Sequence, residues 1–239
     1  MKGKWLVLLE GKESYLRNLT DLLRSPECSV IKEEGSYYLS SSRFDLITDE
    51  VQVCACATEL LTRINAAAMV YFGDVKPFTL DVIVRVDEDG KRNRECLLSA
   101  TWTIEDFGFD IQWDGSEDFS QHPSYLETWI KIAGAEPDDK IKKVFRILTE
   151  RKDWVNLYKV YEVVQEDVGK RITEDGWATK KKTECFSRTA QSPGAIGDDA
   201  RHGVEKSEPP KNPMSLLEAQ RLIIVIVRKW LEWKSKEQK

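Results

Sequence analysis

The feature that most constrains the fold of this chain is a change of hydrophobic period about halfway along it. Up to about residue 115, several segments alternate apolar and polar residues, as strands with one buried face do, and 78–86 is the clearest of them. From Ser124 onward, apolar residues recur at helical spacing as far as the last helix. We therefore predict an α+β fold class, with an N-terminal antiparallel sheet followed by a C-terminal all-α bundle.

The N-terminal half is predicted to pair its sheet with one long and one short helix. Short β-branched and aromatic runs bounded by turn residues predict the strands, whereas apolar residues three and four apart predict the helices. Strands are expected at 4–10, 28–31, 37–40, 78–86, 95–104 and 109–113. Helices are expected at 13–24 and 49–72, and Gly73 ends the longer one.

The C-terminal half is predicted to be a bundle of four-helix type. Helices are expected at 125–133, 140–149, 153–169, 177–190 and 215–234. Ser215 and Glu218 have the spacing of a capping box at the start of the last helix. That helix is apolar on all sides between Leu222 and Val227, which is typical of a central position in a bundle. We place the two domains at 1–120 and 121–239.

Composition and missing motifs exclude several functional classes. The chain has 41% hydrophobic residues, enough for a core, but its longest apolar run is too short to span a membrane. Glu10 interrupts the N-terminal apolar run, so no signal peptide is expected, and the five Cys residues follow no disulfide pattern. These features predict a cytoplasmic protein. No phosphate-binding Gly-rich loop, dinucleotide fingerprint, nucleophile elbow or zinc-ligand spacing occurs, so no metal or cofactor is expected.

Charge is unevenly distributed along the chain. From Pro137 onward there are 22 Lys and Arg against 17 Asp and Glu, whereas the preceding part has 14 against 24. The acidic N-terminal part and the basic C-terminal part predict surfaces with different partners. A modestly basic second half permits a polyanionic partner such as RNA without requiring one.

A long loop at 192–213 carries the most suggestive residues. Its centre, Gly-Asp-Asp-Ala-Arg-His-Gly, concentrates ionisable groups between two glycines, and loops this long are usually functional or disordered. In one interpretation Asp198 or Asp199 pairs with Arg201 and staples a surface loop. In the other, His202 and its neighbours form a polar site for phosphate or RNA.

A basic run precedes this loop. Lys180, Lys181 and Lys182 are consecutive, and Arg171 lies shortly upstream. Such runs are usually solvated surface, but these residues are also candidates for a nucleic-acid-binding track beside the loop.

The C-terminal part resembles a known family. The helix at 153–162 carries Tyr and Glu, a second helix ends Phe-Ser-Arg-Thr-Ala, and the Arg-His-Gly turn and an apolar helix follow. This order is similar to the HEPN class of helical-bundle domains, found in bacterial toxins and phage-defence proteins. The resemblance covers about 137–239 and assigns no family to the N-terminal half.

The resemblance implies a reaction. Many HEPN proteins are dimeric, metal-independent ribonucleases with an Arg a few residues before a His. His202 corresponds to that His, and Arg201 or Arg188 to the Arg, although Arg201 is adjacent to it and Arg188 lies well upstream. Glu162 is the residue expected to orient the Arg. The implied chemistry is transesterification by the RNA 2′-hydroxyl, with His202 moving the proton and an Arg stabilising charge on the phosphate.

Two functions follow as expectations. The first is RNA cleavage or RNA binding in a defence or toxin setting. The second is a non-catalytic interaction protein, whose helical half dimerises and whose acidic N-terminal domain acts as a sensor or binds a protein partner. A homodimer is expected in either case, because the last helix, with Trp230 and Trp233, carries more apolar surface than one bundle readily hides.

Overall fold

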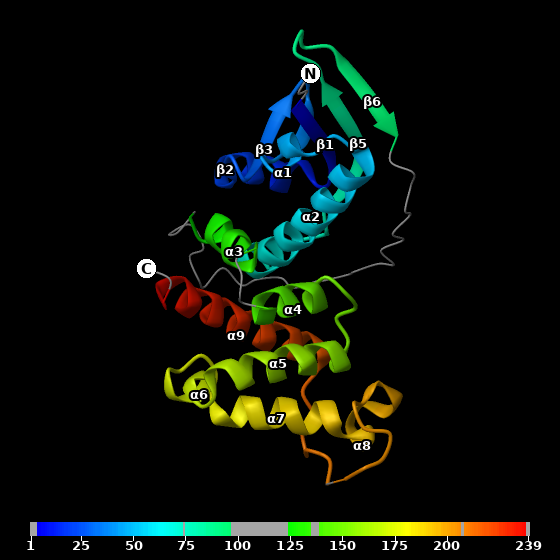
Figure 1. Cartoon of the computed structure of the whole chain (residues 1–239). Helices are drawn as coiled ribbons and strands as arrows, with labels where there is room; N and C mark the ends of the chain where they lie inside the picture. Colours follow the sequence, from blue (N-terminus) through cyan, green and yellow to red (C-terminus); the bar gives the residue numbers. More distant parts are fainter. Residues whose placement is uncertain (1–3, 74, 97–123, 135–138, 207, 238–239) are drawn as a thin grey trace.

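A computed structural model describes residues 4–73, 75–96, 124–134, 139–206 and 208–237. Figure 1 shows the sheet with α1 and α2 at one end of the molecule and the helices α4 to α9 at the other. The predicted α+β class is confirmed. The elements are β1 (Lys4–Glu10), α1 (Glu13–Leu22), β2 (Arg24–Ser25), β3 (Cys28–Glu33), β4 (Ser36–Ser40), η1 (Phe44–Leu46), α2 (Glu50–Phe72), β5 (Thr79–Val86), β6 (Arg92–Cys96), α3 (Ser124–Gly134), α4 (Asp139–Leu148), α5 (Trp154–Val168), α6 (Arg171–Glu174), α7 (Lys180–Gln191), α8 (Pro193–Ile196), η3 (Gly197–Asp199) and α9 (Leu216–Glu237).

The described strands form one antiparallel sheet in the order β2-β3-β4-β1-β5-β6. The β3–β4 hairpin closes through Glu34 and Gly35, whose φ angles of 51° and 83° are both positive, as a type I′ turn requires. Glu33 therefore pairs with Ser36, and the register places alternate residues of each strand on the helix-covered face. The strand predicted at 95–104 overlaps β6 at residues 95 and 96, since β6 begins three residues earlier. The rest of that strand and the strand predicted at 109–113 lie outside the described residues.

The long helix α2 lies between the sheet and the helical half. Asp49 caps it by accepting a hydrogen bond from the Val51 amide at 3.0 Å, and Gly73 ends it with a φ of 82°. By length and composition α2 is apolar enough to cross a membrane, but more than half of that apolar window is buried inside the protein. It packs against β5, α3, α4 and α9, as the core helix of a soluble protein does.

The helical half is built around α5 and α9, and its helix ends match local sequence signals. Asp153 caps α5 by accepting from the Asn156 amide at 2.8 Å. The Ser215–Glu218 capping box is confirmed, because the Ser215 amide donates to the Glu218 carboxylate at 2.8 Å and the Glu218 amide donates to the Ser215 hydroxyl at 3.3 Å. The central position predicted for the last helix is also confirmed by the burial of its apolar residues.

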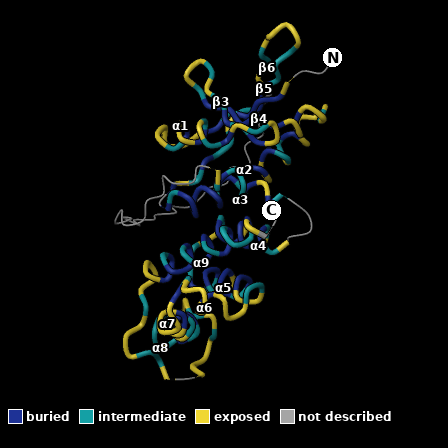
Figure 2. The backbone as a smooth tube through the Cα atoms, turned by 90° about the vertical axis from the view of Figure 1, so that its left-hand side faces the viewer, coloured by how far each residue is buried: buried dark blue, intermediate teal, exposed yellow. Residues whose placement is uncertain are grey.

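One buried hydrophobic core runs through both halves of the chain. It extends from Trp5 on β1 to Leu231 on α9, and Figure 2 shows the buried residues concentrated in the middle of the molecule. Arg228 on α9 is itself buried, and its Nε and Nη2 donate to the Val70 carbonyl near the end of α2 at 3.2 and 2.8 Å. The boundary at residue 120 stays a prediction, since it lies outside the described residues.

The structure corrects three details of the helical half. The helix predicted at 177–190 begins at Lys180, because the Thr179 hydroxyl caps it by accepting from the Lys182 amide at 3.3 Å. The loop at 192–213 is not structureless, since it contains α8 and η3. Trp230, one of the residues that motivated the dimer, is fully buried within the chain, whereas Leu216 and Leu217 at the start of α9 are exposed, and self-association stays a prediction.

Candidate nucleic-acid interface

Helix α7 is the platform of the candidate site. Thr183, Phe186 and Ala190 face inward, which follows from their helical spacing. The Phe186 ring lies 6.0 Å from the Tyr158 ring in a stacked arrangement and 5.5 Å from the Tyr161 ring in an edge-on one. These aromatic contacts hold α7 along α5 and leave the opposite face of α7 open to solvent.

Arg201 lies at the end of α7 and is oriented by residues of α5. Its amide donates to the Ala190 carbonyl at 2.9 Å, and its guanidinium lies 3.1 Å from the Glu162 carboxylate. The guanidinium also lies over the Tyr158 ring, 4.6 Å from the centroid. The Tyr158 hydroxyl accepts a hydrogen bond from Gln191 at 2.6 Å. Arg201 is thereby held in one orientation while about a third of its side chain, 36%, stays exposed.

The phenol of Tyr158 reflects this environment. Burial raises the pKa of Tyr158, and the neighbouring Glu162 carboxylate raises it further. Arg201 and Gln191 act in the opposite direction without reversing the shift. Tyr158 therefore stays protonated at neutral pH and serves as an uncharged support for the Arg201 guanidinium.

The four predicted catalytic residues are only partly brought together. Glu162 and Arg201 form an ion pair, as the family resemblance implied. Arg188 lies elsewhere on α7 and donates to the Glu208 carbonyl at 2.8 Å. His202 is half-buried, and within the described part of the chain its ring makes no hydrogen bond.

The structure also tests the interpretation in which an ion pair between Arg201 and a neighbouring aspartate fixes the loop. Asp198 and Asp199 are exposed in η3, and Arg201 pairs instead with Glu162, which lies 39 positions earlier. The interpretation in which Asp198 or Asp199 pairs with Arg201 was therefore wrong, because the partner of Arg201 is Glu162. Arg201 ties the loop to α7 and α5, and within the loop the Glu205 carboxylate accepts hydrogen bonds from the Ser192 hydroxyl at 2.8 Å and the Gly194 amide at 2.6 Å.

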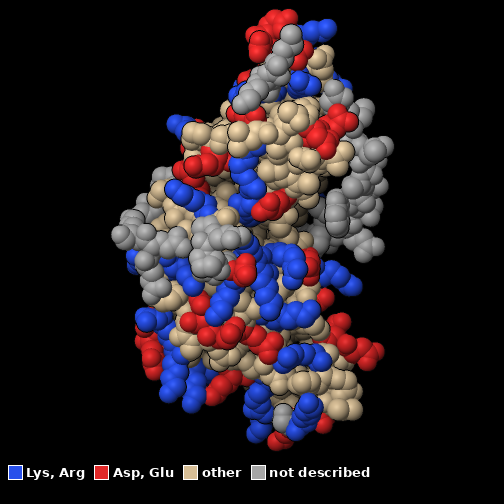
Figure 3. Space-filling model, in the orientation of Figure 1, with Lys and Arg blue, Asp and Glu red and all other residues tan. Residues whose placement is uncertain are grey.

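A groove of about 1310 Å³ runs over the exposed face of α7. It lies between α5 and α6 on one side and residues 208–212 on the other, and Lys and Arg side chains gather over α6 and the start of α7 at the lower left of Figure 3. Its lining carries more positive than negative charge. The charged side chains that line it are Lys170, Lys180, Lys181, Glu184, Arg188, Glu208 and Lys211.

The groove matches the predicted binding residues in part. Lys180 and Lys181 line it, whereas Lys182 does not. Arg171 points elsewhere, pairing with Asp175 at 3.2 Å and lying over the Trp233 ring.

Two lysines of the groove were missed by sequence reasoning. Lys170 follows the glycine that ends α5, and Lys211 lies in the loop after α8. Lys170 stands directly before Arg171 in the sequence, so the adjacent basic residues were a local signal for Lys170. No signal in the sequence around Lys211 shows that this residue faces α7.

The groove leads toward Arg201 along one helix. Arg188 in the groove and Gln191 beside Tyr158 are three positions apart on α7, about one turn or ~5 Å along its axis. Arg188 is the last residue of α7 that lines the groove, and Arg201 and Glu162 are not part of its lining.

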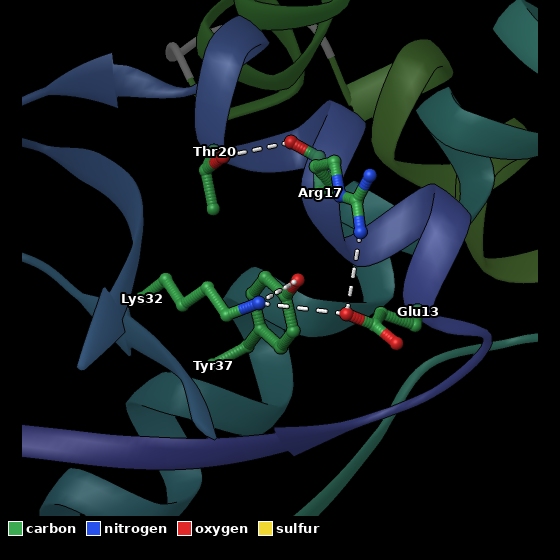
Figure 4. Close-up of polar contacts among 5 residues, drawn as sticks. All are labelled: Glu13, Arg17, Thr20, Lys32 and Tyr37. Carbon is green, nitrogen blue, oxygen red and sulfur yellow. Dashed lines mark hydrogen bonds and ion pairs between the residues drawn. The ribbon is translucent and has the colours of Figure 1, made fainter. Parts of the chain in front are cut away.

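A second polar cluster lies on the sheet half, between α1 and the β3–β4 hairpin (Figure 4). Lys32 donates to the Tyr37 hydroxyl at 3.0 Å and to the Glu13 carboxylate at 3.4 Å, and Arg17 also donates to Glu13. Hydrogen bonds from Lys32 and Arg17 lower the pKa of Glu13. The charged side chains are largely solvent-exposed, whereas Tyr37 is buried, and together they connect α1 to the sheet rather than enclosing a ligand.

Comparison with protein-family models, curated proteins and solved structures found no match. The resemblance to HEPN domains therefore depends on the sequence pattern alone. Among the described residues, no three His, Cys, Asp or Glu side chains converge as a metal site requires. What the site offers chemically is a set of exposed cations on and beside α7, together with an Arg201 guanidinium that Glu162 and Tyr158 hold in place.

Proposed function

We propose that this protein binds RNA along α7. The observation that carries the proposal is the groove, in which five cationic side chains face two carboxylates. Lys and Arg side chains neutralise backbone phosphates and release their counterions, which is the main sequence-independent source of RNA affinity. Arg188, which lines the groove, has a guanidinium fork that can hold a phosphate through two parallel hydrogen bonds.

Salt dependence tests the binding mode. If four of the five cations contact phosphates of a single strand, the slope of log affinity against log salt should be about −3, or ~0.7 per contact. The double variant Lys180→Ala/Lys181→Ala should reduce the slope to about −1.5 on the same basis. Fluorescence anisotropy with a labelled single-stranded RNA measures both. The matched control is Lys143→Ala/Arg146→Ala, which removes two exposed cations from α4.

Either of two results would contradict RNA binding by this groove. One is an unchanged slope in the α7 double variant. The other is an equal loss in the α4 control, which would show that only net charge matters.

A second proposal is metal-independent cleavage of the bound RNA. The pairing of Arg201 with Glu162, next to His202 in the chain, favours it. The 2′-hydroxyl oxygen attacks the adjacent phosphorus, and the bond to the 5′-oxygen breaks, leaving a 2′,3′-cyclic phosphate and a 5′-hydroxyl. His202 moves the proton, since imidazole exchanges protons near neutral pH, and Arg201 stabilises the charge on the phosphate oxygens.

Cleavage is tested with RNA in EDTA, and the products are analysed for cyclic ends. His202→Ala should abolish cleavage while leaving RNA affinity nearly unchanged. Arg201→Ala should lower the rate by about 10²–10³, the usual effect of losing a charge-stabilising donor. We expect a smaller loss from Arg188→Ala, because Arg188 is held away by Glu208. Intact RNA at high protein concentration, or unchanged cleavage by His202→Ala, would leave RNA binding without catalysis.

The biological setting we propose is cytoplasmic, in defence or as a toxin, with the helical half acting as an HEPN-like dimer. If RNA is neither bound nor cleaved, the better account is the interaction protein with an acidic partner-binding N-terminal domain. Light scattering at tens of micromolar tests the dimer, which a monomeric mass would exclude.

A further inference from the structure

Residues 208–213, Glu-Pro-Pro-Lys-Asn-Pro, form one bank of the groove, and we call them the strap. Half of the strap is proline, which has no amide hydrogen to donate. The strap is therefore attached to α7 mainly through its own carbonyl oxygens, which accept hydrogen bonds from α7 side chains. The strength of this attachment therefore depends on which α7 side chains donate the hydrogen bonds.

Arg188 is the strongest of these donors among the described residues. Its Nη2 donates to the Glu208 carbonyl at 2.8 Å. At the other end, the Cys185 thiol lies 3.6 Å from the Asn212 carbonyl, and a thiol is a weak donor. Directly after the strap, the Met214 amide donates to the Thr189 hydroxyl of α7 at 3.1 Å. The Arg188 guanidinium is thus the main polar attachment at the Glu208 end, and it also lines the groove.

The attached position of the strap is a specific packed arrangement. Pro209 lies against Gly194, where a Cβ atom would approach the proline Cγ to 2.7 Å. Adjacent prolines also make the chain stiff, so the strap can leave α7 as a unit rather than residue by residue.

We propose that RNA phosphate and the strap compete for Arg188, so that RNA binding releases the strap from α7. This inference rests on the proposed RNA binding. A phosphate oxygen is ionised, and its hydrogen bonds with a guanidinium are roughly twice as strong as those of a neutral carbonyl. The phosphate replaces the Glu208 carbonyl on Arg188, and no covalent bond changes. The strap then acts as a built-in competitor that lowers affinity for weakly charged ligands.

The first test examines the attachment without any ligand. Trypsin cleavage after Lys211, followed by mass spectrometry of the intact chain, reports how often the strap leaves α7. Arg188→Ala should raise the initial cleavage rate severalfold over wild type, while Arg146→Ala, an exposed arginine of α4, should not. Equal rates in Arg188→Ala and wild type would overturn the proposal, whether or not the protein binds RNA.

The second test holds the strap in place. Asn212→Cys adds a thiol to the residue whose backbone carbonyl lies 3.6 Å from the Cys185 thiol, and formation of the disulfide by oxidation is checked by mass spectrometry. The oxidised variant should bind single-stranded RNA about tenfold more weakly than the reduced variant, the loss of one charge-assisted contact. Dithiothreitol should restore the affinity. Equal affinities would overturn the coupling and leave RNA binding intact, whereas no binding by the reduced variant or by wild type would reject the proposed function itself.

Discussion

Asp167 on α5 is the polar centre of the helical half, and removing its charge should destabilise the protein strongly. Its carboxylate accepts hydrogen bonds from Trp230 at 2.8 Å and from Lys140 at 3.1 Å, and it pairs with Lys234 at 2.9 Å. The side chain is only 12% exposed. It therefore joins α5 to α4 and α9 in surroundings where solvent screens little.

The substitution Asp167→Asn keeps the shape but removes the charge. One amide oxygen replaces two carboxylate oxygens, and the amide NH₂ is a donor placed among donors. Hydrogen bonds with charged groups contribute ~1.5–3 kcal/mol each, and breaking a buried pair costs ~3–5 kcal/mol. Because Lys140 is partly exposed, we expect the free energy of unfolding to fall by about 3 kcal/mol, which lowers the Tm by about 6–12 °C.

The pH dependence gives a second signature. Burial opposes ionisation of Asp167, but the hydrogen bonds from Lys234, Trp230 and Lys140 outweigh it and lower the pKa of the carboxyl. A lowered pKa stabilises the folded state above the unfolded-state value of about 3.9 and stops doing so as the pH falls through the folded-state value. The difference between wild type and Asp167→Asn should therefore shrink below about pH 4.

Urea unfolding, followed by tryptophan fluorescence and by circular dichroism, measures these differences at pH 7 and at pH 3.5. The matched control is Glu166→Gln, the neighbouring residue, whose side chain is 72% exposed and lies 3.8 Å from Lys140. It should change the free energy of unfolding by less than ~0.5 kcal/mol. A loss below about 1 kcal/mol for Asp167→Asn, or one equal to that of the control, would refute the reasoning.

Two further predictions concern the core. Arg228→Met removes both hydrogen bonds to the Val70 carbonyl and should lower the free energy of unfolding by about 2 kcal/mol. The control Lys236→Met, at an exposed position, should leave the free energy of unfolding nearly unchanged. Thermal unfolding compares the two variants, and equal losses would contradict the role of Arg228. Burial raises the pKa of Cys28 to about 12, so at pH 8 iodoacetamide should modify the half-buried Cys185 and spare Cys28 in the folded protein. Peptide mapping reads both sites, and rapid modification of Cys28 would argue against its burial.

Local sequence signals predicted the elements because each signal acts within a few residues. Asp49 and the Ser215–Glu218 pair bond amides of their own first turn, so their effect can be predicted without knowing the rest of the fold. The same holds for the Glu34-Gly35 turn, whose positive φ angles set the hairpin register. The short helices α6 and α8 were missed because four residues carry too little periodicity to be recognised.

The partners of the site residues were decided by packing. Arg201 has two aspartates nearby in sequence, yet it pairs with Glu162, because its attachment to the end of α7 places its guanidinium over the Tyr158 ring of α5 and beside that carboxylate. Sequence reasoning offered Arg188 as a catalytic partner of His202. In the structure, the strap passes over α7 so that the Arg188 guanidinium donates to the Glu208 carbonyl. Such choices depend on the position of whole helices, which no short window of sequence contains.

The sequence by itself determined the α+β class, most of the helix and strand positions and the basic character of the second half, because periodicity, caps and charge are local properties. Only the tertiary structure decided that α2 and α9 share one core through Arg228 and Val70, and that Lys170 and Lys211 face the same groove. The physical reason is that burial and long-range pairing depend on how the helices pack, and packing is a property of the whole chain.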